Sequence, residues 1–404
     1  MMKVRTRKVV LFSAKVVVAG VLLAWVVAQV HWRDYVQTRD GRRSYAVVQP
    51  PGAVASEGTL RVDVGPWWVE RIETRRVSDF QAVAGGQIVR PGFATSLRAI
   101  NIALAAGGTL AFGVALLLIA VRWRMLLKIQ DVNVSLWEVT RLTFLGQFFN
   151  AIVPGTVGGD LVKAYYVAKH TPRVAAVVVS IFVDRLLGLV ELALMAGVML
   201  GLLLLGGRRS FNDFSLPAIC MAAILLAVAG MLTFLLSQRF RRALHLDKLY
   251  RRMPIAHHIA AAGDAALRYR QRLGTMAWAV AVSVISHLAF VGFVALMGAS
   301  LSIPVGPMEY FLYVPLIYII GAIPLTPGGV GWVENWYLRF FESPACGAST
   351  ILVLALLARL VPMLWGLPGA VVAVTGARVP APEVIEAELS AGQQAEDQAI
   401  APRS

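Results

Sequence analysis

The sequence predicts an all-α polytopic membrane protein with a small β-rich extracytoplasmic insertion. Of its 404 residues, 58% are hydrophobic and only 15% are charged, whereas a soluble domain of this length carries roughly a quarter charged residues. Apolar runs long enough to cross a bilayer recur along the chain. Two further apolar stretches are cut by proline and glycine, which indicates helices that break at membrane depth.

The net charge of +15 does not indicate a nucleic-acid partner. The basic residues lie at the ends of apolar runs, where they orient spans and meet anionic lipid, and they form no stripe interleaved with aromatic residues. Cys220 and Cys346 stand far apart, without metal-like spacing and without a neighbouring histidine. We therefore interpret both cysteines as packing residues and expect neither a metal nor a cofactor.

We expect about six full spans, with ends accurate to about four residues. They cover residues 9–30, 99–121, 174–205, 216–237, 275–299 and 349–376.

Residues 1–30 are predicted to be an uncleaved membrane anchor. Basic residues precede its apolar run, which puts the N-terminus in the cytoplasm; they are Lys3, Arg5, Arg7 and Lys8. A signal peptide is the competing interpretation. Lys15 interrupts the run, and no clean small-residue cleavage site follows, so we prefer the anchor.

The segments between and after the spans differ in composition. Residues 31–98 contain strand-like alternation in "TLRVDVG" and "WWVERIETRRV", so a small β-rich insertion outside the membrane is expected, with a possible envelope-biosynthesis protein as its partner. Residues 238–274 are basic and amphipathic, which suits the inner leaflet. The tail 377–404 has the composition of a disordered segment and is expected in the cytoplasm.

The two interrupted stretches, 141–156 and 310–341, are predicted to be re-entrant broken helices. Each must enter and leave on one side, the first from the inside and the second from the outside, if the spans are to alternate. They lie in the two halves of the 99–376 region, about 99–205 and about 275–376. This arrangement predicts an inverted repeat with a binding site near the bilayer midplane.

A weak sequence repeat supports this prediction. "AIVPGTVGGDLVKAYY" begins at Ala151 and "AIPLTPGGVGWVENWY" begins at Ala322, and this gapless alignment places Lys163 opposite Glu334. The identical positions are Ala151/Ala322, Ile152/Ile323, Gly158/Gly329, Val162/Val333 and Tyr166/Tyr337.

The first break has the composition of a phosphate site. A broken helix exposes backbone N–H groups and a partial positive charge. Gly155, Gly158 and Gly159 would let a ligand approach the backbone closely. Asp160 is expected to cap the restarting helix, and Lys163 lies one turn further on.

Arg185 and Arg359 each occur about three turns into a predicted span. A charge at the bilayer centre costs roughly 2.5–3.5 kcal/mol even on the lenient insertion scale, so both should face the interior. They are expected to hold an anionic headgroup. The alternative is structural ion pairing of Arg185 or Lys163; the candidate acids are Asp160, Asp184, Glu191 and Glu334.

Three other polar residues admit simpler readings. Glu334 follows the second break and could hold a cationic group or a proton, or be an ordinary charge at a helix terminus. Asn150 is expected to satisfy freed backbone groups. His287, beside Ser283 and Ser286, is expected to be a hydrogen-bonded packing histidine.

Nucleotide binding is not expected. "GTVGGDLVK" lacks the Gly-Lys-Ser/Thr of a phosphate-binding loop, and no strand precedes it. Asp34 and Asp40 follow the first span, where some membrane glycosyltransferases place catalytic acids, but without a tighter motif we interpret them as loop residues.

Three segments together resemble one family: "FLGQFFNAIVPGTVGGDLVKAYY", "VSIFVDRLLGL" and "AIPLTPGGVGWVE". They are similar to the lysylphosphatidylglycerol synthase transmembrane-region family, the flippase-like integral membrane proteins, over about 99–376. The resemblance implies movement of a lipid across the cytoplasmic membrane. The family's basic residue is often Arg where this chain has Lys163, and we expect no synthase domain here, because only a short tail follows residue 376.

The family pattern, including its Thr-Pro-Gly-Gly motif, carries substrate-binding roles onto twelve positions here. They are Asn150, Pro154, Gly158, Gly159, Asp160, Lys163, Asp184, Arg185, Gly328, Gly329, Glu334 and Arg359.

The resulting hypothesis is a non-enzymatic lipid flippase of a prokaryotic inner membrane. Its substrate would be a phospholipid or polyprenyl-linked lipid, whose headgroup crosses a polar groove between the two broken-helix motifs. Two alternatives are a membrane enzyme or accessory subunit of envelope glycolipid synthesis, using Asp34, Asp40 or Asp63, and a non-transporting scaffold that recruits partners through 31–98.

Overall fold

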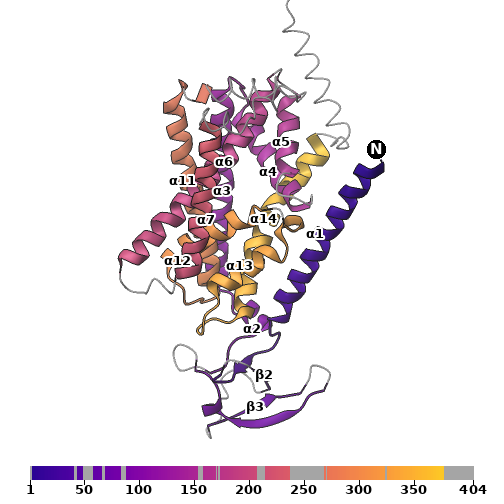
Figure 1. Ribbon diagram of the computed structural model, residues 1–404, viewed down its shortest axis with the longest axis vertical. Coiled ribbons are helices and arrows are strands. Elements are labelled where there is room, and N and C mark those ends of the chain that lie inside the picture. Colours follow the sequence, from indigo (N-terminus) through magenta and orange to yellow (C-terminus); the bar gives the residue numbers. More distant parts are fainter. Residues whose placement is uncertain are drawn as a thin grey trace, which may run out of the picture. The chain divides into compact units, whose positions relative to one another are not determined.

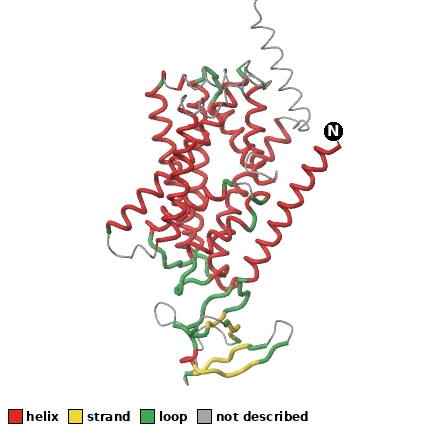
Figure 2. The backbone as a smooth tube through the Cα atoms, viewed as in Figure 1, coloured by secondary structure: helices red, strands yellow, loops and turns green. Residues whose placement is uncertain are grey.

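Helices dominate the computed structural model, and a small sheet accompanies them (Figure 2). The structure describes residues 2–40, 43–48, 58–65, 69–82, 88–152, 158–169, 171, 173–206, 214–236, 268–269, 271–323 and 325–376. The predicted class, a helical protein with a small β-rich insertion, is confirmed. The tail 377–404 and most of 238–274 lie outside the described residues.

Four described helices are long and apolar enough to cross a bilayer. They correspond to four of the predicted spans and comprise Ile102–Ile129, Val174–Leu205, Leu273–Ser300 and Ala348–Val374. The other two predicted spans also form helices, but their described apolar parts are shorter, Lys15–Ala28 and Ser215–Leu226. The count of six full spans therefore stays a prediction.

By its internal contacts the chain divides into two units. Unit 1 comprises residues 1–109 and 292–360, and unit 2 comprises residues 110–291 and 361–404. The division falls within three long helices, α3 (Ile102–Ile129), α11 (Leu273–Ser300) and α14 (Ala348–Gly376).

The remaining elements belong to one unit each and are labelled in Figure 1 where there is room. Unit 1 holds α1 (Met2–Ala28), β1 (Tyr35–Gln37), β2 (Ser44–Val47), β3 (Thr59–Asp63), β4 (Ile72–Arg76), η1 (Val77–Asp79), α2 (Phe93–Arg98), α12 (Pro307–Gly321), η3 (Pro327–Gly329) and α13 (Trp332–Phe341). Unit 2 holds α4 (Leu136–Ile152), α5 (Gly158–Ala168), α6 (Val174–Leu205) and α7 (Ser215–Leu236).

The sheet of unit 1 is antiparallel, with strand order β1-β2-β3-β4. Strand β3 alternates as its sequence predicts, because Leu60 and Val62 are buried while Arg61 is exposed. Together with Val36 and Phe80 these residues form a small core. The strand predictions from "TLRVDVG" and "WWVERIETRRV" are thereby confirmed, in β3 and β4 respectively.

The sheet is attached to the start of α14 within unit 1. The backbone N–H of His31 donates to Ser349 Oγ at 3.0 Å, and Ser349 Oγ donates back to the His31 carbonyl at 3.1 Å. The His31 and Tyr35 rings stack with centroids 3.9 Å apart. A Cβ at Gly347 would lie 2.0 Å from Tyr35 Oη, so the glycine lets the tyrosine approach the backbone.

The second broken helix, which lies in unit 1, turns at glycines whose backbone is in the left-handed region. α12 ends at Gly321, and α13 begins at Trp332. Between them Gly328, Gly329 and Gly331 have φ of 61°, 69° and 76°, a conformation that costs other residues free energy. α1, drawn in indigo in Figure 1, packs against η3 and α13.

Unit 2 packs α4 and α5 side by side, with α6 against α5 (Figure 1). Its largest buried side chain is Trp123 of α3, within an apolar core that also includes Leu145 and Val177. The end of α14 lies close to α4, because a Cβ at Gly369 would meet the Phe144 carbonyl oxygen at 2.2 Å.

Gly331→Ala should destabilise unit 1. Its φ is 76°, and the new Cβ would lie 2.8 Å from Leu22 Cβ and from the Leu23 nitrogen in α1. Residues forced into such conformations cost about 1–3 kcal/mol, before any steric overlap is counted. We expect a lower melting temperature for the protein in detergent micelles. Gly20→Ala is the control, since nothing lies within 4 Å of its Cβ. An unchanged melting temperature for Gly331→Ala would contradict the packing of α1 on this turn.

Candidate functional site

The first break is capped by Asn150 rather than by Asp160. Asn150 Oδ1 near the end of α4 accepts a hydrogen bond from the Gly159 N–H at 2.9 Å, in the first turn of α5. The expectation for Asn150 is therefore confirmed. The expected cap from Asp160 is wrong, because Asp160 lies inside the first turn of α5 and its carboxylate points to cations. Pro154 and Gly155 lie outside the described residues.

The glycines flanking this break serve helix packing. A Cβ at Gly159 would lie 2.0 Å from the Gly146 carbonyl oxygen. A Cβ at Gly146 would lie 2.4 Å from Lys163 Cε, so the stem of Lys163 crosses α4 at this glycine. The close approach expected of a ligand at Gly159 is thus made by α4. Gly158 is the first residue of α5.

Asp160 holds two cations of unit 2. Arg185 Nε donates to Asp160 Oδ2 at 2.5 Å, and Lys163 Nζ lies 3.7 Å from Oδ1. The side chains of Asp160 and Lys163 are about nine-tenths buried, at 9% and 11% exposure, whereas that of Arg185 is 50% exposed. The three side chains carry a net positive charge, and Arg185 presents part of it to the surroundings.

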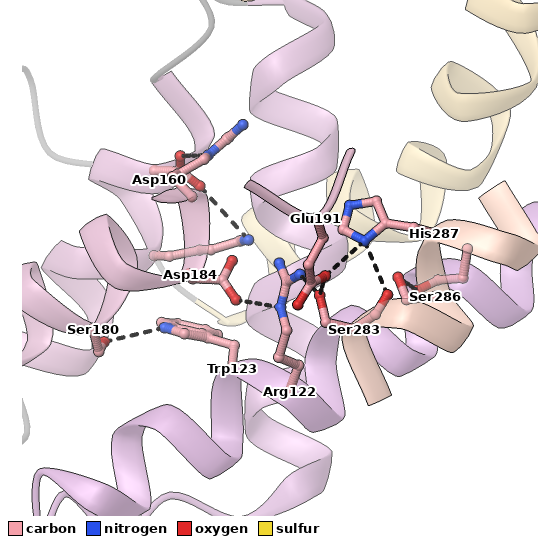
Figure 3. Close-up of polar contacts among 12 residues, drawn as sticks. Arg122, Trp123, Asp160, Ser180, Asp184, Glu191, Ser283, Ser286 and His287 are labelled. Carbon is pink, nitrogen blue, oxygen red and sulfur yellow. Dashed lines mark hydrogen bonds and ion pairs between the residues drawn. The ribbon is translucent and has the colours of Figure 1, made fainter. Parts of the chain in front are cut away.

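Trp123 lies beneath the lysine of this cluster. Lys163 Nζ is 5.3 Å from the centroid of its ring, within cation–π range. The indole N–H of Trp123 donates to Ser180 Oγ at 3.3 Å, which fixes the ring orientation (Figure 3). The ammonium group is thus held between a carboxylate and an aromatic face.

The second break, in unit 1, carries its own acid–arginine pair. Arg359 Nε donates to Glu334 Oε1 at 2.6 Å, and Arg359 Nη1 donates to the Gly328 carbonyl at 2.9 Å. Glu334 Oε2 accepts from the Gly331 N–H at 2.8 Å, so this carboxylate also caps α13. Gly328 and Gly329 form the turn and offer their carbonyls to Arg359.

The two pairs share one sequence separation. Asp160 and Arg185 are 25 residues apart, and so are Glu334 and Arg359. In each case the acid lies in the first turn after a break, and the arginine lies in the following long helix. By this spacing Asp160 occupies the position that corresponds to Glu334, whereas the gapless alignment placed Lys163 opposite Glu334.

Asp184 belongs to a different group of unit 2. Arg122 Nε donates to Asp184 Oδ1 at 2.7 Å, and both side chains are largely buried. The sequence placed Arg122 at the end of a span at residue 121, but α3 continues to Ile129. Nothing in the linear pattern distinguishes an interior arginine from one at the membrane surface, so this residue was missed.

Glu191 and His287 complete this group. His287 Nδ1 lies 2.9 Å from the Ser283 carbonyl, which confirms a hydrogen-bonded histidine. It also lies 3.0 Å from Glu191 Oε2, a partner that the sequence did not identify (Figure 3). Among the described residues no cluster of three or more His, Cys, Asp or Glu could hold a metal ion.

A double-mutant cycle on Glu334 and Arg359 should reveal strong coupling. Glu334→Gln leaves a guanidinium without its carboxylate, and Arg359→Gln leaves a carboxylate that is only 4% exposed without its cation. Breaking one partner of a buried pair costs about 3–5 kcal/mol. We expect each single variant to lower the free energy of unfolding in micelles, and the double variant to lose much less than the sum. Additive losses would contradict the pairing.

Comparisons with known proteins agree with this architecture. Residues 91–369 match the family described as the lysylphosphatidylglycerol synthase TM region. A UPF0104 membrane protein of Pyrococcus horikoshii is 26% identical over 151 residues, which cover 36% of this chain and 44% of that relative. With several helices long and apolar enough to span a bilayer, the chain is a multi-pass membrane protein, and it belongs to the lysylphosphatidylglycerol synthase TM region family.

Proposed function

We propose that this protein moves a lipid with an anionic headgroup, of the phospholipid or polyprenyl-phosphate type, across the cytoplasmic membrane of a prokaryote. The Lys163–Asp160–Arg185 cluster is the main support for this proposal. Two cations share one carboxylate immediately after a helix break, in a chain that crosses the membrane. Ionisable residues in such segments are costly and mark pathways for substrates or ions.

The charges of this cluster suit a phosphate. A phosphate that replaced Asp160 at the guanidinium of Arg185 would gain charge-assisted hydrogen bonds. Lys163 would contribute a point charge from its buried position over Trp123. Asp160 then acts as the internal substitute for the lipid, since it neutralises the cations while no headgroup is bound.

The apolar surroundings suit the rest of a lipid. Long apolar helices of unit 2 have many exposed side chains, including Phe182 and Leu194 on α6, at 54% and 59% exposure. Acyl or polyprenyl chains would remain in the bilayer while the headgroup passes the cations. Because the hydrocarbon chains stay in the bilayer, the protein needs no enclosed cavity for them.

We further propose that the two broken helices are copies of one inverted repeat. The equal separation of Asp160 from Arg185 and of Glu334 from Arg359 supports this. Transporters of this kind place their sites on discontinuous helices. The arginine of the unit 2 copy is the more accessible of the two, since Arg359 is 21% exposed and Arg185 is 50% exposed. The unit 2 copy is therefore our choice for headgroup contact.

The orientation in the membrane is also a proposal. The basic residues before α1 support a cytoplasmic N-terminus, which would put the sheet of unit 1 outside. There it could contact a partner of envelope biosynthesis.

An enzyme acting through the acids of the insertion is less well supported. Asp34 Oδ1 accepts the Gly92 N–H at 2.8 Å. Asp63 accepts N–H groups of Gly65 and Arg71, and these bonds lower the pKa of Asp63. Both carboxylates shape loops, so neither is poised as a catalytic acid.

The test is translocation of fluorescent lipids in proteoliposomes, read by dithionite quenching. The parent should move a labelled anionic lipid faster than a zwitterionic one. Lys163→Ala and Arg185→Ala each remove a charge-assisted contact of about 1.5–3 kcal/mol, so the rate should fall about ten- to a hundredfold.

Two controls accompany this test. Lys163→Arg keeps the charge and should keep transport. Arg141→Ala removes an ion pair with Glu138 on α4 that is not part of the cluster, and it should leave the rate unchanged. Rates equal to those of empty liposomes for anionic, zwitterionic and polyprenyl lipids alike would refute the proposal that the protein moves lipid without a partner.

A further inference from the structure

A second polar network of unit 2 links three helices. Arg122 Nη1 of α3 donates to Ser283 Oγ of α11 at 2.5 Å. Ser283 Oγ in turn donates to Glu191 Oε2 of α6, and His287 Nδ1 lies 3.0 Å from the same oxygen (Figure 3). The directions are fixed, because arginine can only donate and the hydroxyl proton must therefore go to the carboxylate.

The histidine of this network has one nitrogen whose proton can vary. Its Nδ1 lies 2.9 Å from the Ser283 carbonyl, which can only accept, so Nδ1 carries a proton. Nε2 is then the site that gains or loses one. Gly188 lies beside this nitrogen, since a Cβ there would be 3.6 Å from Nε2 and 3.8 Å from Arg122 Nη1.

The network by itself carries a net negative charge while His287 is neutral. Asp184 and Glu191 are two carboxylates, and Arg122 is one guanidinium. Their side chains and that of His287 are all at most 13% exposed. The neighbouring Asp160, Lys163 and Arg185 carry a net positive charge, so the two groups together are neutral while His287 is neutral. A proton on the His287–Glu191 pair gives them one positive charge together, which a bound anionic headgroup would offset.

Glu191 also has an unused acceptor. Its Oε1 is buried and receives no hydrogen bond from the described residues. A buried acceptor without a donor costs free energy. Protonation of the carboxyl at this oxygen would neutralise the buried charge of Glu191, so the pair offers two positions, Nε2 and Oε1, for one proton.

We propose that the His287–Glu191 pair is a proton-binding site that exchanges one proton during transport. The proton adds to Nε2 or Oε1 and later leaves from the same pair, with no other bond made or broken. The coupling to a lipid rests on the proposed function, whereas proton binding itself does not.

Adjacent residues connect this site to the lysine cluster. Arg122 precedes Trp123 on α3, and Asp184 precedes Arg185 on α6. Consecutive helical residues point about 100° apart, so each helix turns one residue to the network and the next to the cluster. A change in charge at His287–Glu191 alters the hold on Arg122 and Asp184, and thereby the positions of Trp123 and Arg185.

The proton site is tested on the full chain by NMR of histidine rings labelled with ¹⁵N, in lipid nanodiscs. The chain has six histidines, and His287→Gln assigns the signal. We expect the ring signals of His287 to report the gain of a proton as the pH is lowered, and Glu191→Gln to alter that change. Ser286→Ala, at a contact of 3.4 Å with the Ala115 carbonyl, should not alter it. A His287 signal that does not change with pH, or that changes identically in Glu191→Gln, would overturn the proposal.

Transport under a pH gradient separates this inference from the proposed function. The parent's rate for a labelled anionic lipid should change at least about threefold when a gradient is imposed across the proteoliposome. Glu191→Gln and His287→Gln should lose that response. A titrating His287 without any lipid movement would refute the lipid function and retain the proton site. A response unchanged in both variants would refute the coupling.

Discussion

Pairing of buried carboxylates with arginine is the constraint on which both units depend. A lone charge at membrane depth costs roughly 2.5–3.5 kcal/mol or more, so each must find a partner on a neighbouring element. Asp160 ties the start of α5 to α6, and Glu334 ties the start of α13 to α14. Asp184 joins α6 to α3 through Arg122. The ion pairs thereby fix where a helix that restarts after a break must lie.

The backbone at both breaks needs glycine, either for a left-handed turn or for a close contact between helices. These glycines therefore have a structural role that is distinct from that of the charged residues. Gly328, Gly329 and Gly331 supply left-handed turns, and Gly159 supplies the close contact of α5 with α4. These glycines position the acids. On the proposed function the headgroup would meet the cations, and Arg185 is the most exposed member of the two acid–arginine pairs.

Composition and local pattern predicted the helical class, both breaks, strands β3 and β4, and the two arginines opposite the breaks. Which acid meets which basic residue could not be predicted in the same way, because it depends on the rotation of each helix about its axis. Arg122 therefore looked like a boundary charge, and Glu191 could not be matched with His287, although 96 residues separate two side chains that meet. A gapless alignment likewise placed Lys163 opposite Glu334. The equal spacing of the two acid–arginine pairs instead places Asp160 at the position that corresponds to Glu334.

The central claim is that the unit 2 cluster receives a lipid phosphate. The most direct measurement is an experimental structure of the protein in nanodiscs that contain an anionic phospholipid. We expect a headgroup phosphate within about 3 Å of Arg185 and Lys163, with the Asp160–Arg185 bond lengthened and the acyl chains outside the cluster. A cluster that stays closed on Asp160, with lipid headgroups bound only at other surfaces, would contradict it.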